Sequence, residues 1–264
     1  MTGLTDTHCH LTNDRLAARA QAVLEEARAA GVVACITAAS DVADSRAAAE
    51  LAGGLEGVYC SAGVHPHEAK DAQEGYVGQL EQIIRGAGKK CVAVGEIGLD
   101  YHYDFSPRDR QRQVFGEQLE LAARLRLPVI VHCREAVEDT LAMLAGAAGR
   151  VAGVIHSFTG DSAEVRRFLD QGWHIGFAGI LTFKTAQANR EAASLVPAEK
   201  LLVETDAPYL SPEPVRKVFP NVPAHVLHTA RLLAELRGVS LEVLAGQTTA
   251  NACRLFGLGE LRPS

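Results

Sequence analysis

The chain has 264 residues, of which 47% are hydrophobic and 22% are charged, and its formal net charge is −6. This balance excludes an intrinsically disordered protein, and the acidity argues against a protein that coats nucleic acid through a positive field. The longest apolar runs, Val32–Ile36 and Leu141–Ala145, are far shorter than the roughly 20 residues of a membrane-spanning helix. The N-terminus lacks the basic and apolar regions of a signal peptide. We therefore expect a cytoplasmic protein without membrane association.

Short apolar segments, most of them rich in Val and Ile, recur along the chain and predict β-strands. They do not alternate strictly, which is typical of parallel strands covered on both faces. In chain order the eight expected strands are Leu4–Thr7, Val32–Ala38, Val58–Ala62, Cys91–Val94, Pro128–Val131, Ala152–Ile155, Trp173–Phe177 and Leu201–Val203.

Amphipathic segments between these strands predict helices. Apolar residues share one helical face in segments 16–27, 162–169 and 224–236. Ser106, as a cap, and Pro107 in the first turn begin a further helix that continues to Leu125. Eight strand–helix units predict an α/β protein with a single domain over residues 1–264, a (β/α)8 TIM barrel. An open, doubly wound sheet is the alternative.

Six ionisable residues stand where the expected strands end: His8, His10, Glu96, His132, His156 and Asp206. In a barrel the carboxyl ends of the strands form one rim, so these side chains would converge in space. His8 and His10 are two residues apart, and residues at that spacing point to the same face of a strand. Burying all six groups without partners would be costly. The set therefore predicts a site for one or two divalent metal ions.

Seven motifs follow one another along almost the whole chain: DTHCHL (6–11), GVHPHE (63–68), AVGEIGLDYHYD (93–104), LPVIVHCREA (127–136), VIHSFTG (154–160), IGFAGILTFK (175–184) and ETDAPYLSPEP (204–214). In this order they resemble the TatD-type metal-dependent deoxyribonucleases. The resemblance implies a TIM barrel of the metal-dependent hydrolase type with a one- or two-metal centre. It also implies hydrolysis of DNA, often as a 3′–5′ exonuclease, and the same six residues as metal ligands.

Phosphodiester hydrolysis needs an activated water, neutralised charge and help for the leaving oxygen, which two metal ions can supply together. We expect Glu96 to bridge the ions, with His8 and His10 on one ion and the histidines of the fifth and sixth strands on the other. Asp206 would bind one ion and orient or deprotonate the attacking water. Imidazole ligands favour Zn²⁺ or Mn²⁺, and the resemblance points also to Mg²⁺.

Four further residues are weaker candidates for the site. His65 would contact a metal-bound phosphate or hydrogen-bond a ligand. Arg134 would hold a phosphate through two hydrogen bonds, unless it is a surface charge at a helix start. Glu204 would orient a histidine ligand or form a buried ion pair. Lys184 would guide a DNA strand, although a solvated charge is the commoner outcome.

Other polar and aromatic residues receive structural interpretations. Asp100 would either position the loop after the fourth strand or lie in a simple turn, and the turn is favoured. Ordinary packing is favoured over base stacking for Phe183 and Tyr209. His67 is expected to be a surface or structural histidine, as are His102, His174, His225 and His228.

The expected substrate is DNA, either single-stranded or at its 3′ ends, and no obligate protein partner is indicated. Two alternatives stay open. A deacylase could use the same metal-bound water to remove D-amino acids from mischarged tRNA, because that water can also attack an acyl ester. A non-catalytic barrel could bind nucleic acid, but a degenerate ligand set would then be expected. A cyclic-amide hydrolase is disfavoured because such enzymes usually carry a carbamylated lysine where Glu96 stands.

Overall fold

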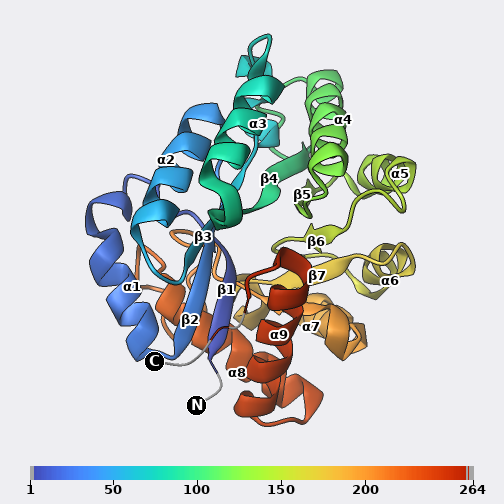
Figure 1. The fold of residues 1–264 in the computed structure, drawn as a ribbon. Coiled ribbons are helices and arrows are strands. Elements are labelled where there is room, and N and C mark those ends of the chain that lie inside the picture. The colour runs from blue at the N-terminus through green and yellow to red at the C-terminus, as the bar shows by residue number, and fades with distance from the viewer. Residues whose placement is uncertain (1–2, 260, 262–264) are drawn as a thin grey trace.

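The structure is a computed structural model that describes residues 3–259 and 261 (Figure 1). Within this range eight strands form one sheet in the order β1 to β8, and every neighbouring pair is parallel. The strands are β1 (Leu4–Cys9), β2 (Val32–Thr37), β3 (Val58–Ala62), β4 (Cys91–Asp100), β5 (Val129–Arg134), β6 (Gly153–Ile155), β7 (His174–Phe177) and β8 (Leu201–Val203).

The sheet closes between its first and last strands. Cys9 forms a parallel bridge with Ala207, just beyond the end of β8. The N–H of His10 donates to the carbonyl of Ala207 at 2.7 Å, and the N–H of Asp206 donates to the carbonyl of His8 at 2.9 Å. The predicted (β/α)8 barrel is therefore confirmed, and closure brings the chain after β1 beside the chain after β8.

Helices follow the strands and surround the sheet (Figure 1). Over the described residues they are α1 (Ala20–Ala29), α2 (Val42–Gly54), α3 (Tyr76–Ala87), α4 (Arg108–Leu125), α5 (Val137–Gly146), α6 (Ser162–Asp170), α7 (Gln187–Leu195), α8 (Val226–Arg237) and α9 (Leu241–Phe256). Short 3-10 helices are η1 (Ala17–Arg19), η2 (Pro66–Asp71), η3 (Gly88–Lys90), η4 (Gly179–Thr182), η5 (Ala198–Lys200) and η6 (Pro223–His225). None of these described helices is long and apolar enough to cross a lipid bilayer.

Ser106 does not cap helix α4, contrary to the expectation from the sequence. Pro107 occupies the capping position, and no side chain bonds the first turn there. The Ser106 hydroxyl instead donates to the carbonyl of His67 at 2.7 Å and accepts from the N–H of Lys70 at 3.0 Å. It therefore ties the loop before α4 to η2, because its bonding partners lie in that neighbouring loop.

The core has two parts. The larger part lies between the sheet and its helices. The smaller part draws on residues of five strands, on the C-terminal end of α9 and on the residues after it: Ile36, Val92, Ala93, Ile130, Val154, Leu202, Ala252, Phe256 and Leu258. The interior is therefore packed with apolar side chains and leaves the polar residues to the end of the barrel.

Strand β4 continues past its predicted end at Val94 as far as Asp100. Between Val94 and Ile97 it carries one residue more than β5 does, and Glu96 lies in this bulge. Bulges bend a strand and redirect a side chain, and they are common at barrel rims and beside active sites. The bulge explains how Glu96 can lie within a strand and still point into the polar end of the barrel.

Candidate metal centre

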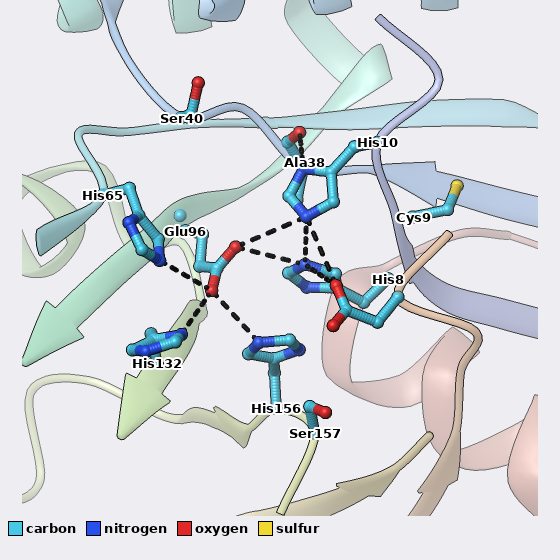
Figure 2. A network of polar contacts seen from close by, with 12 residues as sticks. His8, Cys9, His10, Ala38, Ser40, His65, Glu96, His132, His156 and Ser157 are labelled. Atoms are coloured by element: carbon cyan, nitrogen blue, oxygen red, sulfur yellow. Dashed lines mark hydrogen bonds and ion pairs between the residues drawn. The ribbon is translucent and has the colours of Figure 1, made fainter. Parts of the chain in front are cut away.

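The six predicted ligands meet at the carboxyl end of the barrel, although they come from five different strands or the residues after them. Figure 2 labels five of them, and the four labelled histidine rings point toward Glu96 in the middle; Asp206 lies beside His8 and His10. They are His8 in β1, His10 directly after it, Glu96 in β4, His132 in β5, His156 directly after β6 and Asp206 after β8.

The Glu96 carboxylate is 3% exposed and contacts both sides of the cluster. Its Oε2 lies 3.2 Å from His8 Nε2 and 3.7 Å from His10 Nε2. Its Oε1 lies 2.8 Å from His132 Nδ1 and 3.0 Å from His156 Nε2. Each carboxylate oxygen therefore faces a different pair of histidines, which is the arrangement a bridging carboxylate requires.

The Asp206 carboxylate completes the side of the cluster formed by β1. Its Oδ1 lies 3.4 Å from His10 Nε2 and 3.8 Å from His8 Nε2. The backbone of Asp206 has a φ of 57°, in the left-handed region, and Ser157 beside His156 has a φ of 43°. Residues other than glycine adopt this backbone conformation at an energetic cost, and residues in such conformations cluster at functional sites.

Among the described residues, three groups of side chains could hold a metal ion, and within each group the donor atoms lie within 4.8 Å of one another. They are His8 with His10 and Asp206; His8 with Glu96 and His156; and His65 with Glu96 and His132. Glu96 belongs to two of the groups, as a bridging ligand would. His132 and His156, which we expected on one ion, fall in different groups.

The protonation of three histidines follows from their hydrogen-bond partners. The ring nitrogen turned away from Glu96 faces an oxygen that can only accept: Ala38 O at 3.1 Å from His10, Asp100 Oδ2 at 3.0 Å from His132 and Glu204 Oε1 at 3.1 Å from His156. When the inner nitrogen uses its lone pair to hold a metal ion, the outer nitrogen carries the proton and donates to this acceptor.

The inner nitrogens converge closely enough to suit a cation. Nε2 of His8 and Nε2 of His10 are 3.2 Å apart. Facing lone pairs repel one another, whereas a divalent cation between such nitrogens and carboxylate oxygens is stabilised. The donor set and the outer hydrogen bonds of His10, His132 and His156 therefore fit a metal centre, whereas the outer nitrogen of His8, Nδ1, is buried without a hydrogen-bond partner among the described residues.

His65, unlike these histidines, directs a protonated ring nitrogen toward Glu96. Its Nδ1 accepts a hydrogen bond from the N–H of His67 at 3.1 Å, so its Nε2 carries the proton. That Nε2 lies 3.3 Å from Glu96 Oε1. Burial lowers the pKa of His65 to about 4, although Glu96 acts in the opposite direction, so the ring is neutral at pH 7. In this arrangement His65 is a hydrogen-bond donor to Glu96, one of the two roles expected of it.

The charges of the cluster support one another. Burial alone would raise the pKa of Glu96, but the surrounding histidines, His156 most of all, outweigh it and lower that pKa well below its usual range. Burial would likewise raise the pKa of Asp206, but His10 and its neighbours lower it. Both carboxylates are therefore ionised at neutral pH and can attract a cation.

Two residues of the site were not expected from the sequence. Asp100 is buried at the end of β4 rather than placed in a simple turn, and its Oδ2 accepts from His67 Nε2 at 2.9 Å and from His132 Nε2 at 3.0 Å. His67 lines the cavity above the cluster. The available signal was the apolar spacing of Ile97 and Leu99, which extends the strand to Asp100.

The weaker candidates have different positions. Glu204 is buried and contacts the outer nitrogen of His156, as described above, and Thr7 Oγ1 donates to its Oε2 at 3.2 Å. Arg134 lines the cavity. Lys184 is exposed and is not among the described residues that form the cavity wall. Tyr209, for which packing was favoured, lines the cavity and is 43% exposed.

A cavity of about 650 Å³ opens above the cluster. Its wall includes five of the six predicted ligands, and His8 is buried beneath them. Cavities of about 300–1,000 Å³ are typical of sites for small molecules and cofactors. The cluster is therefore accessible to a ligand of nucleotide size.

Comparisons with known proteins agree with this geometry. The model of the family described as "TatD related DNase" matches residues 5–257. The uncharacterized metal-dependent hydrolase YabD of Bacillus subtilis is 37% identical, over 96% of this chain and 98% of that protein. The 3′–5′ ssDNA/RNA exonuclease TatD of Pantoea ananatis is 38% identical, over 96% of this chain and 99% of that protein.

A solved structure shows the same similarity in three dimensions. The crystal structure of YjjV, a TatD homologue from Escherichia coli K12, matches with a TM-score of 0.91 and 32% sequence identity. The match covers 96% of this chain and 98% of that one. The chain therefore belongs to the TatD family of metal-dependent hydrolases.

Proposed function

We propose that this chain hydrolyses phosphodiester bonds in DNA, as a 3′–5′ exodeoxyribonuclease that acts on single strands or 3′ ends. The observation that carries the proposal is the Glu96-centred cluster at the base of an open cavity, with the cation Arg134 in the same wall. The relative from Pantoea ananatis, and another from Klebsiella pneumoniae that is 36% identical, are named 3′–5′ ssDNA/RNA exonucleases. Their names support a nucleic-acid substrate for this chain.

One or two divalent ions, Mg²⁺, Mn²⁺ or Zn²⁺, would be held by the six clustered residues: His8, His10, Glu96, His132, His156 and Asp206. When bound, such ions neutralise phosphate charge and lower the pKa of water. Glu96 would bridge, because its two oxygens face different pairs of histidines. The acceptors behind the histidines would hold the inner nitrogens in the orientation that ligation needs.

Asp206 is the proposed catalytic carboxylate for the attacking water. It lines the cavity, and its side chain is 14% exposed, so water and substrate can reach it. Its lowered pKa keeps it ionised at neutral pH. An ionised carboxylate accepts a hydrogen bond from water and so aims the water's lone pair at phosphorus.

Arg134 and His65 would act on the phosphate itself. Both line the cavity, and the guanidinium of Arg134 can donate two hydrogen bonds to non-bridging oxygens. The Nε2–H of His65 points at the centre and can donate to an oxygen that approaches Glu96. These contacts would favour the extra negative charge that develops during attack.

The test is cleavage of end-labelled strands by protein that has been stripped of metal and then reloaded with Mg²⁺, Mn²⁺ or Zn²⁺. Single-stranded DNA labelled at either end, duplex DNA and RNA would be compared, with D-aminoacyl-tRNA as the competing ester substrate. Stepwise shortening from the 3′ end is expected, and Asp206→Asn should lose it. Asp109→Asn is the matched control, because the Asp109 side chain is 94% exposed. Metal-dependent release of D-amino acids without strand cleavage would instead identify a deacylase, and activity on neither would identify a non-catalytic barrel.

A further inference from the structure

Exposed apolar side chains are concentrated in two loops, and two of these side chains, Tyr103 and Tyr209, line the cavity. Among the described residues, seven large hydrophobic side chains are exposed, and five of them lie in the loops that follow β4 and β8: Tyr103, Phe105, Tyr209, Val218 and Phe219. Single exposed apolar residues are normal on a protein surface, but a concentration beside a functional cavity indicates ligand contact. Four of these five side chains are aromatic.

Tyr103 and Phe105 form a stacked pair in the loop after β4. Their ring centroids are 5.2 Å apart and their planes are inclined by 19°. They are 46% and 54% exposed, and Tyr103 lines the cavity. The guanidinium carbon of Arg134 lies 4.7 Å from the centroid of Tyr103, and His67 meets Phe105 edge-on at 4.8 Å. The cavity wall thus combines flat aromatic surface with a cation.

This pair is fixed relative to the metal centre. The N–H of Tyr103 donates to Asp100 Oδ1 at 2.9 Å, while the other oxygen of Asp100 holds His132. Gln111 of α4 spans the loop, because its Nε2 donates to the carbonyls of Asp100 at 3.0 Å and Ser106 at 2.8 Å. The aromatic pair therefore needs little ordering when a ligand binds.

We propose that Tyr103 and Phe105 form a stacking site for one unpaired base of the strand whose phosphate lies over Glu96. This inference depends on the proposed function and adds a base-binding subsite to it. Aromatic rings bind bases through their faces irrespective of base identity, and a neighbouring arginine, here Arg134, strengthens such contacts. A base within a duplex already stacks on both neighbours, so the site requires an unpaired or frayed nucleotide.

The test compares wild-type protein with a variant that carries both Tyr103→Leu and Phe105→Leu. Leucine keeps apolar bulk in the loop but removes the aromatic faces. The substrate is a short oligothymidylate, either intact or with one abasic residue that is moved along the strand position by position. KM and kcat are measured for each strand, together with equilibrium binding.

Wild-type protein should show an increase in KM of about tenfold when the base at one particular position is missing, since the contribution of one stacked base is typically of that order. The variant should show the same increase with the intact strand and no further increase with the abasic one. The kcat for the abasic strand should be equal in the two proteins. Val243→Ala, which removes apolar surface of similar exposure (47%) on α9, should behave as wild type.

Metal content and melting temperature are compared in all proteins, and Phe105→Leu alone serves if the double variant does not fold. An undiminished abasic effect in the variant, or an equal loss on intact and abasic strands, would overturn the stacking site. If wild-type protein cleaves DNA and the variant matches it, the stacking site fails and the proposed function stands. If wild-type protein neither binds nor cleaves any strand, both fail.

Discussion

Asp100→Asn tests whether the carboxylate behind His132 supports the metal centre. Oδ2 of Asp100 accepts from His67 Nε2 at 2.9 Å and from His132 Nε2 at 3.0 Å. Oδ1 accepts from the N–H groups of His102 at 3.0 Å and Tyr103 at 2.9 Å. All four partners donate, so all four need an oxygen. An asparagine has one oxygen and one NH2 group, so in either orientation its NH2 faces two donors.

The expected loss follows from those contacts. If the amide oxygen stays on the backbone, His132 loses the acceptor that sets its ring orientation, and Nδ1 no longer has a fixed direction. Loss of such an outer partner typically lowers metal affinity or activity by about 10–100-fold. That range corresponds to about 1.4–2.7 kcal/mol of metal-binding free energy. If the amide oxygen instead faces the two histidines, the N–H groups of His102 and Tyr103 lose their acceptor. The binding of a DNA strand should then weaken.

The assay is competition for Co²⁺ or Zn²⁺ between the protein and a chelator of known affinity, measured beside strand cleavage. Asp104→Asn is the control, because Asp104 lies in the same loop but forms only an exposed pair with Arg108 at 2.8 Å. Asp100→Asn should lose metal affinity, and Asp104→Asn should not. A double-mutant cycle with His132→Ala separates a local effect from loss of charge, because the effect of Asp100→Asn should largely vanish without His132. Wild-type metal affinity together with wild-type DNA binding in Asp100→Asn would refute the reasoning.

Three further predictions concern the centre itself. Glu96→Gln should lose most metal binding and turnover while circular dichroism stays unchanged, and wild-type turnover would show that Glu96 does not bridge. Asp206→Asn should lower single-turnover cleavage far more than DNA affinity, because aiming the water matters mainly in the transition state; equal losses would make Asp206 chiefly a metal-retention residue. Carboxylates around His10, His132 and His156 outweigh burial and raise the pKa of each ring. These protons must leave before a metal binds, so chelator competition from pH 8 to pH 5 should show affinity falling already above pH 6.5, and constant affinity would contradict this.

The sequence predicted the barrel well because its strands are regular and apolar. The expected strands at Val58–Ala62 and Leu201–Val203 have those bounds in the structure. The main error was the length of β4, whose continuation contains Glu96 and a glycine at position 98. A strand pattern with period two breaks at a bulge, so the pattern suggested an end where the strand only bends.

The convergence of the candidate metal ligands was predictable for a related reason. A polar residue directly after an apolar strand lies at the rim of the barrel. The positions of His132 and His156 in the sequence were therefore enough to predict that they lie close together. Glu204 could be connected with a histidine only because it stands two residues from Asp206. The role of Asp100 could not be inferred in this way, because its partners come from β5 and from the loop after β3.

Which ring nitrogen of a histidine donates a hydrogen bond and which accepts one depends on its partners in the structure. This distinction separates two histidines that the sequence leaves equivalent. His132 and His65 both lie against the same oxygen of Glu96, at 2.8 Å and 3.3 Å. Behind His132 is a carboxylate that can only accept, so a neutral ring that donates to Asp100 presents the lone pair of Nδ1 toward the centre. Behind His65 is a backbone N–H that can only donate, which makes Nε2 a proton donor toward the same centre. Two imidazoles on one carboxylate oxygen therefore present different groups to the centre, and on that difference we propose metal binding for His132 and hydrogen bonding with substrate for His65.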